Sequence, residues 1–180
     1  MQTEIMIAGF GGQGVLFAGE LLAHAGMNAG QHVTWFPSYG PEMRGGTANC
    51  VVIVSDEEIG SPVVRHPKAA LVMNLPSMDK CEPMLIPDGV MIVNSSFVNR
   101  KIQRKDIKSV YIPASEIAEK IAERRLTNMV MLGALLAQMP ILDIEDIKHS
   151  IEEEIPERHR RLLPANLQAI SEGYNYSAHQ

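Results

Sequence analysis

Short apolar runs and longer amphipathic segments follow one another along this chain. Continuous apolar runs occur at 5–8, 51–54, 69–73 and 90–93. Runs of this length next to Gly, Pro or Asp are typical of strands that are buried on both faces. We therefore expect strands in these places, two more at 31–36 and 109–112, and a helix from about Val15 to Ala29.

The last third of the chain is predicted to be helical. Apolar residues recur there at helical spacing, and the segment 129–139 is apolar almost all round, which indicates a helix buried on every side. Gly133 within it would let another helix approach closely, in the same domain or in another subunit. The residues expected to cap these helices are Ser115, Thr127 or Asn128, and Asp143.

The spacing of two strands predicts a mixed sheet. About ten residues, rich in Pro and Gly, separate the strand at 31–36 from the strand at 47–54. Parallel neighbours need a crossover of a dozen or more residues, so this pair should be antiparallel or not adjacent. We expect one α/β domain spanning 1–180, three-layered (α/β/α) and Rossmann-like, with a mixed but mostly parallel sheet.

The turn after the first strand carries the first candidate site. Gly9, Gly11 and Gly14 fit the spacing G-x-G-x-x-G, in which glycines and a new helix N-terminus cradle a phosphate. A dinucleotide fold also places an acid at the end of the second strand, and none stands there. The alternative is that these glycines bind no phosphate and serve only a tight turn and close packing of the helix on the sheet.

The segment from Pro37 to Gly46 is the second candidate. It is rich in Pro and Gly, and Tyr39 and Met43 are large groups for a loop. Arg44 could bind an anion or a carboxylate beside the glycine amides. The alternative is a wide hairpin in which Arg44 pairs with Glu42 or lies in solvent.

Composition excludes several classes of function. A net charge of −5 argues against a nucleic-acid partner, and no apolar run is long enough to cross a membrane. The glycine turn comes too early for a secretory leader, and two lone cysteines, Cys50 and Cys81, fit a reducing cytoplasm. Two cysteines cannot hold an iron–sulfur cluster alone, and the six histidines show no metal-ligand spacing. We expect neither a metal site nor a nucleophile triad.

The two candidate loops together carry a family resemblance. The segments GFGGQGV at 9–15 and PSYGPEMRGGT at 37–47 resemble the gamma subunit of 2-oxoacid:ferredoxin oxidoreductases. The segments 55–64 and 128–135 fall where that family has matching stretches. The second loop resembles most the chains assigned to 2-oxoglutarate, with those for branched-chain 2-oxoacids next.

The resemblance implies a subordinate role in a larger complex. Such complexes decarboxylate a 2-oxoacid on thiamine diphosphate with Mg, pass electrons through iron–sulfur clusters to ferredoxin or flavodoxin, and transfer the acyl group to coenzyme A. Separate alpha and beta subunits carry the thiamine site, and a ferredoxin-like delta subunit carries clusters. This chain has no G-D-G run followed by Asn-Asn for thiamine diphosphate, because Asp88-Gly89 followed by Asn94 does not fit. We expect it to be catalytically inert alone.

On this view the loop residues border the coenzyme A side of the active site and contact the catalytic subunits. A different hypothesis is a free-standing nucleotide-binding sensor or reductase that uses the turn at 9–14, and a third is a structural module whose loops only pack. The residues predicted to face a cofactor or partner are Gly11, Gly12, Gln13, Tyr39, Glu42, Arg44, Gly45 and Gly46.

Overall fold

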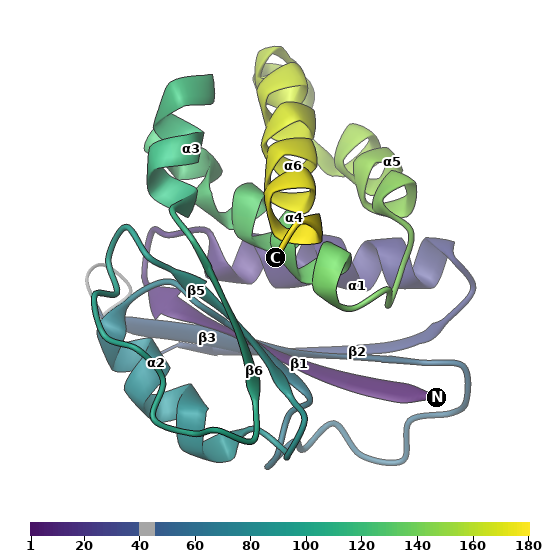
Figure 1. The fold of residues 1–180 in the computed structure, drawn as a ribbon. Helices are drawn as coiled ribbons and strands as arrows, with labels where there is room; N and C mark the ends of the chain where they lie inside the picture. Colours follow the sequence, from purple (N-terminus) through teal and green to yellow (C-terminus); the bar gives the residue numbers. More distant parts are fainter. Residues whose placement is uncertain (40–45) are drawn as a thin grey trace.

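A computed structural model, which describes residues 1–39 and 46–180, shows one six-stranded sheet with helices on both faces (Figure 1). The strand order is β2-β3-β1-β4-β5-β6. The pairs β1–β4, β4–β5 and β5–β6 are parallel, while β3 is antiparallel to both β1 and β2. The strands are β1 (Gln2–Phe10), β2 (His32–Tyr39), β3 (Thr47–Ser55), β4 (Ala69–Val72), β5 (Val90–Asn94) and β6 (Lys108–Ile112).

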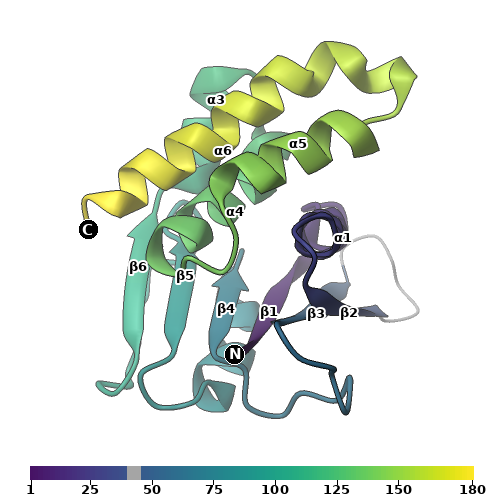
Figure 2. The same ribbon diagram turned by 90° about the vertical axis from the view of Figure 1, so that its right-hand side faces the viewer.

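The helices form unequal layers (Figure 2). On one face α1 and α4 pack against the sheet, α5 and α6 lie outside them, and α3 stands beside α4. On the other face α2 packs against β1 and β4. The expected three-layer mixed fold with a helical last third is confirmed. The helices are α1 (Val15–Asn28), α2 (Leu75–Cys81), α3 (Ala114–Ile121), α4 (Thr127–Gln138), α5 (Ile144–Glu154) and α6 (Leu163–Ala178).

Two apolar cores lie on the two faces of the sheet. The larger core fills the space below α1 and α4, and the smaller one lies under α2. All residues of β4 and β5 are buried, which agrees with their continuous apolar sequence. Methionine fills irregular gaps because its side chain is flexible. The buried methionines, distributed over both cores, are Met6, Met73, Met78, Met91, Met129, Met131 and Met139.

The predicted antiparallel pair is confirmed, but its first strand is longer than expected. β2 continues to Tyr39 and pairs with β3 from His32↔Ser55 to Tyr39↔Ala48. The expected strand ends at Phe36, with Pro37 at the start of the loop that follows. β2 is an edge strand, where a proline with its missing N–H on the free side is tolerated.

The helical third depends on one close crossing of α4 and α6. A Cβ at Gly133 would overlap the carbonyl of Ile170, and a Cβ at Gly173 would overlap the carbonyl of Val130. The two glycines therefore let the helix backbones touch. The sequence predicted that a helix would approach Gly133 closely, in the same domain or in another subunit. That helix is α6 of the same chain. Asp143 caps α5 as expected, through a capping box with Asp146.

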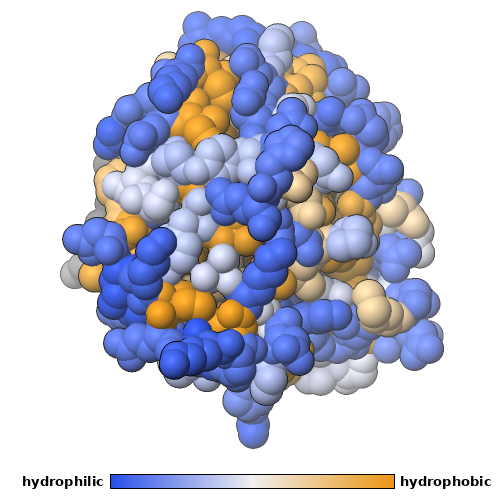
Figure 3. Space-filling model, viewed as in Figure 1, coloured by the Kyte–Doolittle hydropathy of each residue, from blue (hydrophilic) through white to orange (hydrophobic). Residues whose placement is uncertain are grey.

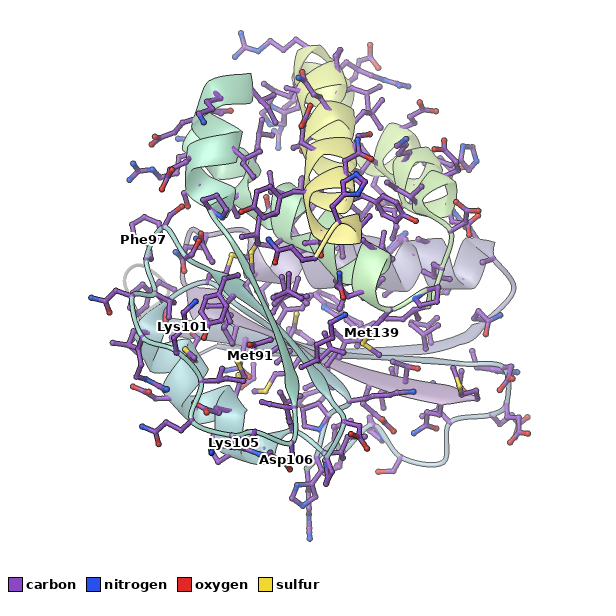
Figure 4. The ribbon with its side chains drawn as sticks, viewed as in Figure 1. Met91, Phe97, Lys101, Lys105, Asp106 and Met139 are labelled. Atoms are coloured by element: carbon purple, nitrogen blue, oxygen red, sulfur yellow. The ribbon has the colours of Figure 1, made fainter. Side chains whose placement is uncertain are left out.

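A buried carboxylate fixes the basic segment between β5 and β6. Figure 4 shows Lys101 and Lys105 beside α2, with Phe97 above them. Glu82, only 6% exposed, accepts bonds from the Arg104 backbone N–H (2.9 Å), the Gln103 backbone N–H and the Arg100 guanidinium (3.0 Å). Burial alone would raise the pKa of Glu82, but these donors hold it below its ordinary value.

The glycine crossing leads to a stability prediction. Gly173→Ala should lower the free energy of unfolding by about 1–3 kcal/mol, because its methyl group forces α4 and α6 apart. The higher helix propensity of alanine offsets only about 1 kcal/mol. Urea unfolding measures the difference. Gly60→Ala, where nothing lies within 4 Å of the new Cβ, is the control and should stay within about 0.5 kcal/mol. An equal loss of unfolding free energy in both variants would contradict the close contact of α4 and α6 at Gly173.

The Glu82 anchor predicts a pH-dependent effect. Glu82→Gln should cost about 1.5–3 kcal/mol at pH 7, since it removes the charge that three donors bind. Because the folded pKa is lowered, this stabilisation is present above the unfolded pKa of about 4.3 and is lost as the pH falls through the folded value. The gap between wild type and variant in urea unfolding should therefore shrink below about pH 4.3. Two outcomes would contradict the role of Glu82. One is a difference in unfolding free energy that stays constant below about pH 4.3, and the other is an equal difference for the exposed control Glu152→Gln.

Candidate functional site

The glycine turn lies where the strand order reverses. It joins β1 to α1 at the carboxyl end of β1. The chain leaves β1 through α1 toward β2 on one side, whereas β4 and β5 extend the sheet on the other side. Ligands of open α/β sheets bind in the crevice at such a switch point. The candidate loop therefore has the position that ligand-binding loops occupy in such sheets.

The side chain of Gln13 connects the carboxyl ends of β1 and β4. Its Oε1 accepts from the Phe10 backbone N–H (2.6 Å) and from Asn74 Nδ2 (3.1 Å). Asn74 in turn caps α2 by accepting the N–H of Ser77. Gln13, predicted to face a ligand, thus uses its carboxamide oxygen inside the chain.

Asn128 holds the turn from the other side. Its Nδ2 donates to the Gly14 carbonyl (3.1 Å), and a Cβ on Gly14 would overlap the Asn128 side chain. Gly14 also has φ +73°, a conformation that favours glycine. The beginning of α4 therefore packs directly onto the glycine turn. Sequence reasoning did not anticipate this contact.

The expected caps of α3 and α4 are wrong. α4 begins at Thr127 after a short 3₁₀ turn, so Thr127 and Asn128 lie inside its first turn and its N-cap is Leu126. The cap of α3 is Pro113, and Ser115 is buried in the helix. These side chains bind neighbouring elements instead. Thr127 Oγ1 donates to the carbonyl of Arg124 (2.6 Å), and Ser115 Oγ accepts from Asn94 Nδ2 (3.1 Å).

The two candidate loops meet. The Gly11 N–H donates to the Gly46 carbonyl at 2.9 Å. Tyr39 ends β2, opposite Ala48 of β3. The structure thus brings the glycine turn and the end of the second loop to the same edge of the sheet. Three of the predicted site residues, Glu42, Arg44 and Gly45, lie outside the described residues.

An apolar hollow opens between these two segments. Its volume is about 340 Å³. Half-buried Phe10, Leu16 and Phe17 line it together with backbone of the turn and of Gly46–Ala48. α1 has no side-chain cap, so its first N–H groups lack a side-chain acceptor at this end. The hollow can hold an apolar stem next to polar backbone.

A basic hollow of about 210 Å³ lies on the other side of the turn. Gly12 and Gln13 form one wall, and the opposite wall comes from the segments after β5 and β6, including exposed Arg124 and Arg125. Arg124 pairs with Glu119 and lies 5.5 Å above the Phe97 ring. Two guanidinium groups beside a glycine turn suit an anion. Sequence reasoning missed both arginines. The available signal was that they belong to the segment after β6, which leaves the sheet at the carboxyl edge shared by its parallel strands.

Neither the two cysteines nor a metal-binding cluster offers a reactive group within the described residues. Burial raises the pKa of the Cys50 and Cys81 thiols to about 12, so neither forms a thiolate near neutral pH. Residues 1–39 and 46–180 hold no cluster of His, Cys, Asp or Glu able to bind a metal ion. Over the same ranges, none of the helices has the length and apolar character that a membrane crossing requires.

The chain matches a family model over most of its length. Residues 4–176 match the model of pyruvate ferredoxin/flavodoxin oxidoreductase. The 2-oxoglutarate synthase subunit KorC of Methanocaldococcus jannaschii is 34% identical over 177 residues, 97% of this chain and 93% of KorC. The ketoisovalerate oxidoreductase subunit VorA of Methanothermobacter thermautotrophicus is 37% identical over 171 residues, 91% of this chain. The chain spans only about a third of VorA (35%).

Solved structures show the same fold. The gamma subunit of a keto/oxoacid ferredoxin oxidoreductase from Geobacter sulfurreducens superposes with a TM-score of 0.85 and 27% identity, covering 99% of both chains. A 2-oxoglutarate:ferredoxin oxidoreductase from Magnetococcus marinus gives a TM-score of 0.89 at 24% identity, over 99% of this chain and 31% of that one. The resemblance inferred from the two loops is confirmed at the level of the family. This chain belongs to the pyruvate ferredoxin/flavodoxin oxidoreductase family.

Proposed function

We propose that this chain is the gamma-type subunit of a 2-oxoacid:acceptor oxidoreductase, most like the 2-oxoglutarate type, with residues 1–180 as one domain. The complex converts a 2-oxoacid to an acyl-coenzyme A. The observation that carries the proposal is the bond between Gly11 and Gly46, because it unites the two motifs of the resemblance in one site. KorC, which this chain matches over almost the whole length of both, supports the 2-oxoglutarate type.

The chain requires partners to act. VorA contains the matching region as about a third of a longer polypeptide. In this proposal the rest of VorA corresponds to the alpha subunit of the complex. A thiamine-binding beta subunit and a ferredoxin-like delta subunit complete it, with ferredoxin or flavodoxin as the electron acceptor. No nucleic acid or membrane takes part.

The role of this subunit is to border the coenzyme A side of the active site. The Magnetococcus marinus enzyme was solved with 2-oxoglutarate, coenzyme A and succinyl-CoA bound. Here the apolar hollow suits a thioester arm, and the basic hollow suits its phosphates. Gly11, Gly12 and Gly46 supply backbone between the two hollows. Tyr39, Glu42, Arg44 and Gly45, with the Nε2 of Gln13, complete the proposed surface.

The chemistry belongs to other chains of the complex. Thiamine diphosphate with Mg supplies the electron sink for decarboxylation, and iron–sulfur clusters carry the electrons away. Both buried thiols of this chain have pKa values raised to about 12, which agrees with a subunit that neither ligates a cluster nor attacks a substrate. We place the complex in the cytoplasm, where such thiols stay reduced.

The alternative is a free-standing nucleotide-binding sensor or reductase. The switch-point position of the turn favours it. One observation weighs against a dinucleotide: β2 ends in Pro-Ser-Tyr, without the acid that would hold the ribose hydroxyls. Calorimetry with NAD, FAD, ATP and coenzyme A separates the hypotheses, since micromolar binding of NAD or FAD would favour the sensor.

Assembly tests the proposal directly. The chain should co-purify from its native cells with a thiamine-binding chain in a stable complex, and that complex should reduce ferredoxin or flavodoxin when given a 2-oxoacid and coenzyme A. The isolated chain should show no such activity, because it lacks a thiamine signature. Recovery of the chain only as a free monomer would overturn the proposed function.

Two arginine variants test the coenzyme A role. In the assembled complex, Arg125→Ala and Arg44→Ala should each raise the KM for coenzyme A by about 10-fold or more, because a charge-assisted hydrogen bond is worth about 1.5–3 kcal/mol. The kcat at saturation should change little. Steady-state kinetics give both values. Arg161→Ala, exposed beyond α5, is the matched control, and an equal effect there would remove the specific role of Arg125.

A further inference from the structure

Four buried polar side chains lie beside the basic hollow at the carboxyl edge of the sheet. Asn94 is 0% exposed, Ser115 2%, Asn128 5% and Thr127 6%. They belong to three different elements, β5, α3 and α4. Because a buried polar group costs free energy unless it is hydrogen-bonded, the partners of these side chains show which parts of the site are fixed to one another.

Three of these side chains form a directed series of hydrogen bonds. Asn94 Nδ2 donates to Ser115 Oγ (3.1 Å), and Thr127 Oγ1 donates to the carbonyl of Arg124 (2.6 Å). The two hydroxyl oxygens, Ser115 Oγ and Thr127 Oγ1, lie 3.2 Å apart. A hydroxyl has one proton, and that of Thr127 is already used, so Ser115 is the donor in this pair. The series therefore ends at the backbone of the turn that carries Arg124 and Arg125.

The other end of the series fixes the aromatic wall of the hollow. Asn94 Oδ1 accepts the Ser96 backbone N–H (3.3 Å), and the Asn94 carbonyl accepts the Phe97 N–H (3.2 Å). The Phe97 ring in turn lies 5.5 Å from the Arg124 guanidinium. One buried network thus determines where Phe97 and the arginine turn stand relative to each other.

The start of α4 also joins the arginine turn to the glycine turn. Asn128 follows Thr127 directly, and its Nδ2 donates to the Gly14 carbonyl (3.1 Å). Gly12 and Gln13 of the glycine turn line the hollow on the side opposite the arginines. Two consecutive side chains therefore hold the two walls at a fixed separation. A site that is ordered before its ligand arrives loses less entropy on binding.

Surface charge alone does not single out this hollow. Hydrophilic residues cover most of the side of the molecule seen in Figure 3. The arginine turn combines exposed charge with a fixed backbone. Arg124 and Arg125 are exposed, whereas Leu126 beside them is only 4% exposed in the core and Thr127 binds the Arg124 carbonyl. Fixing this backbone limits the positions that both guanidinium groups can reach.

We propose that Thr127 is a positioning residue for coenzyme A. Its hydroxyl holds the Arg124–Leu126 turn so that Arg125 stands at the basic hollow and binds a phosphate group of coenzyme A. Arg124 supports the same wall, since its guanidinium pairs with Glu119 and packs on Phe97. Thr127 uses its only proton inside the chain and acts through Arg125. This assignment rests on the proposed function.

Two substitutions at Thr127 separate the hydroxyl from the shape of the side chain. Thr127→Val replaces the hydroxyl by a methyl group, and Thr127→Ser keeps it. In the assembled complex, Thr127→Val should raise the calorimetric Kd and the KM for coenzyme A by about 3- to 10-fold, the effect of one lost neutral hydrogen bond. The kcat at saturation and the KM for the 2-oxoacid should stay within about twofold. Thr127→Ser should restore the affinity, and a Ser variant as weak as the Val variant overturns the proposal.

Ser177→Ala is the matched control. Ser177 is 0% exposed and its Oγ accepts from Gln138 Nε2 (3.0 Å) at the far end of α4, about 16 Å along the helix from Thr127. The variant loses a buried hydroxyl of the same kind but should leave the Kd for coenzyme A unchanged. Urea unfolding measures the stability of each variant. An equal rise in Kd for Ser177→Ala would show general loosening of α4 and overturn the positioning role.

A double variant tests whether Thr127 acts through Arg125. Once Arg125→Ala has removed the guanidinium, adding Thr127→Val should change the Kd for coenzyme A by less than about twofold, because coupled residues are not additive. Losses that multiply in the double variant overturn the proposal. If Thr127→Val fails to assemble, Ser115→Ala takes its place, since it removes the donor to Thr127, and it should weaken binding in the same direction.

The arginine variant separates this proposal from the proposed function. A weakened Kd for Arg125→Ala with wild-type affinity in both Thr127→Val and Ser115→Ala overturns the positioning role and leaves the proposed function standing. Wild-type affinity of Arg125→Ala overturns the coenzyme A role of the basic hollow, and the positioning role of Thr127 with it.

Discussion

The hydrogen bonds of two amide side chains fix the turn on which the site is built. Gln13 joins the end of β1 to Asn74 after β4, and Asn128 joins the turn to the beginning of α4. Glycine alone would leave this turn free to adopt many conformations. The amides remove that freedom from both sides, so Gly11 is held where its N–H reaches the Gly46 carbonyl. The two hollows follow from this arrangement.

The reversed strand β3 has the second large consequence. Because β3 is antiparallel, the connection from β2 to β3 needs no crossover helix, and no helix covers β2 and β3 on the α2 side within the described residues. A purely parallel doubly wound sheet would cover both faces. This fold therefore leaves the α2 side of β2 and β3 without a covering helix in the described part of the chain.

Much of the architecture was readable from pattern. Continuous apolar runs identified the buried strands, and the short Pro- and Gly-rich gap predicted the antiparallel pair. Local rules also identified Asp143 as a cap, since a capping box involves residues only three apart. They failed for Ser115, Thr127 and Asn128, whose partners come from other elements. The capping rule considers only residue type and position. It therefore predicts a cap even where the polar side chain binds another element instead.

By itself the sequence determined the fold class, the mixed sheet, the two candidate loops and the family, because these depend on periodicity and on motifs of contiguous residues. Only the tertiary structure decided that the loops meet, that Gln13 binds Asn74 after β4, and that Arg124 and Arg125 line one hollow with Gly12. More than a hundred residues separate the turn from those arginines. Contacts at such separation arise from strand order and helix packing, which no local pattern encodes.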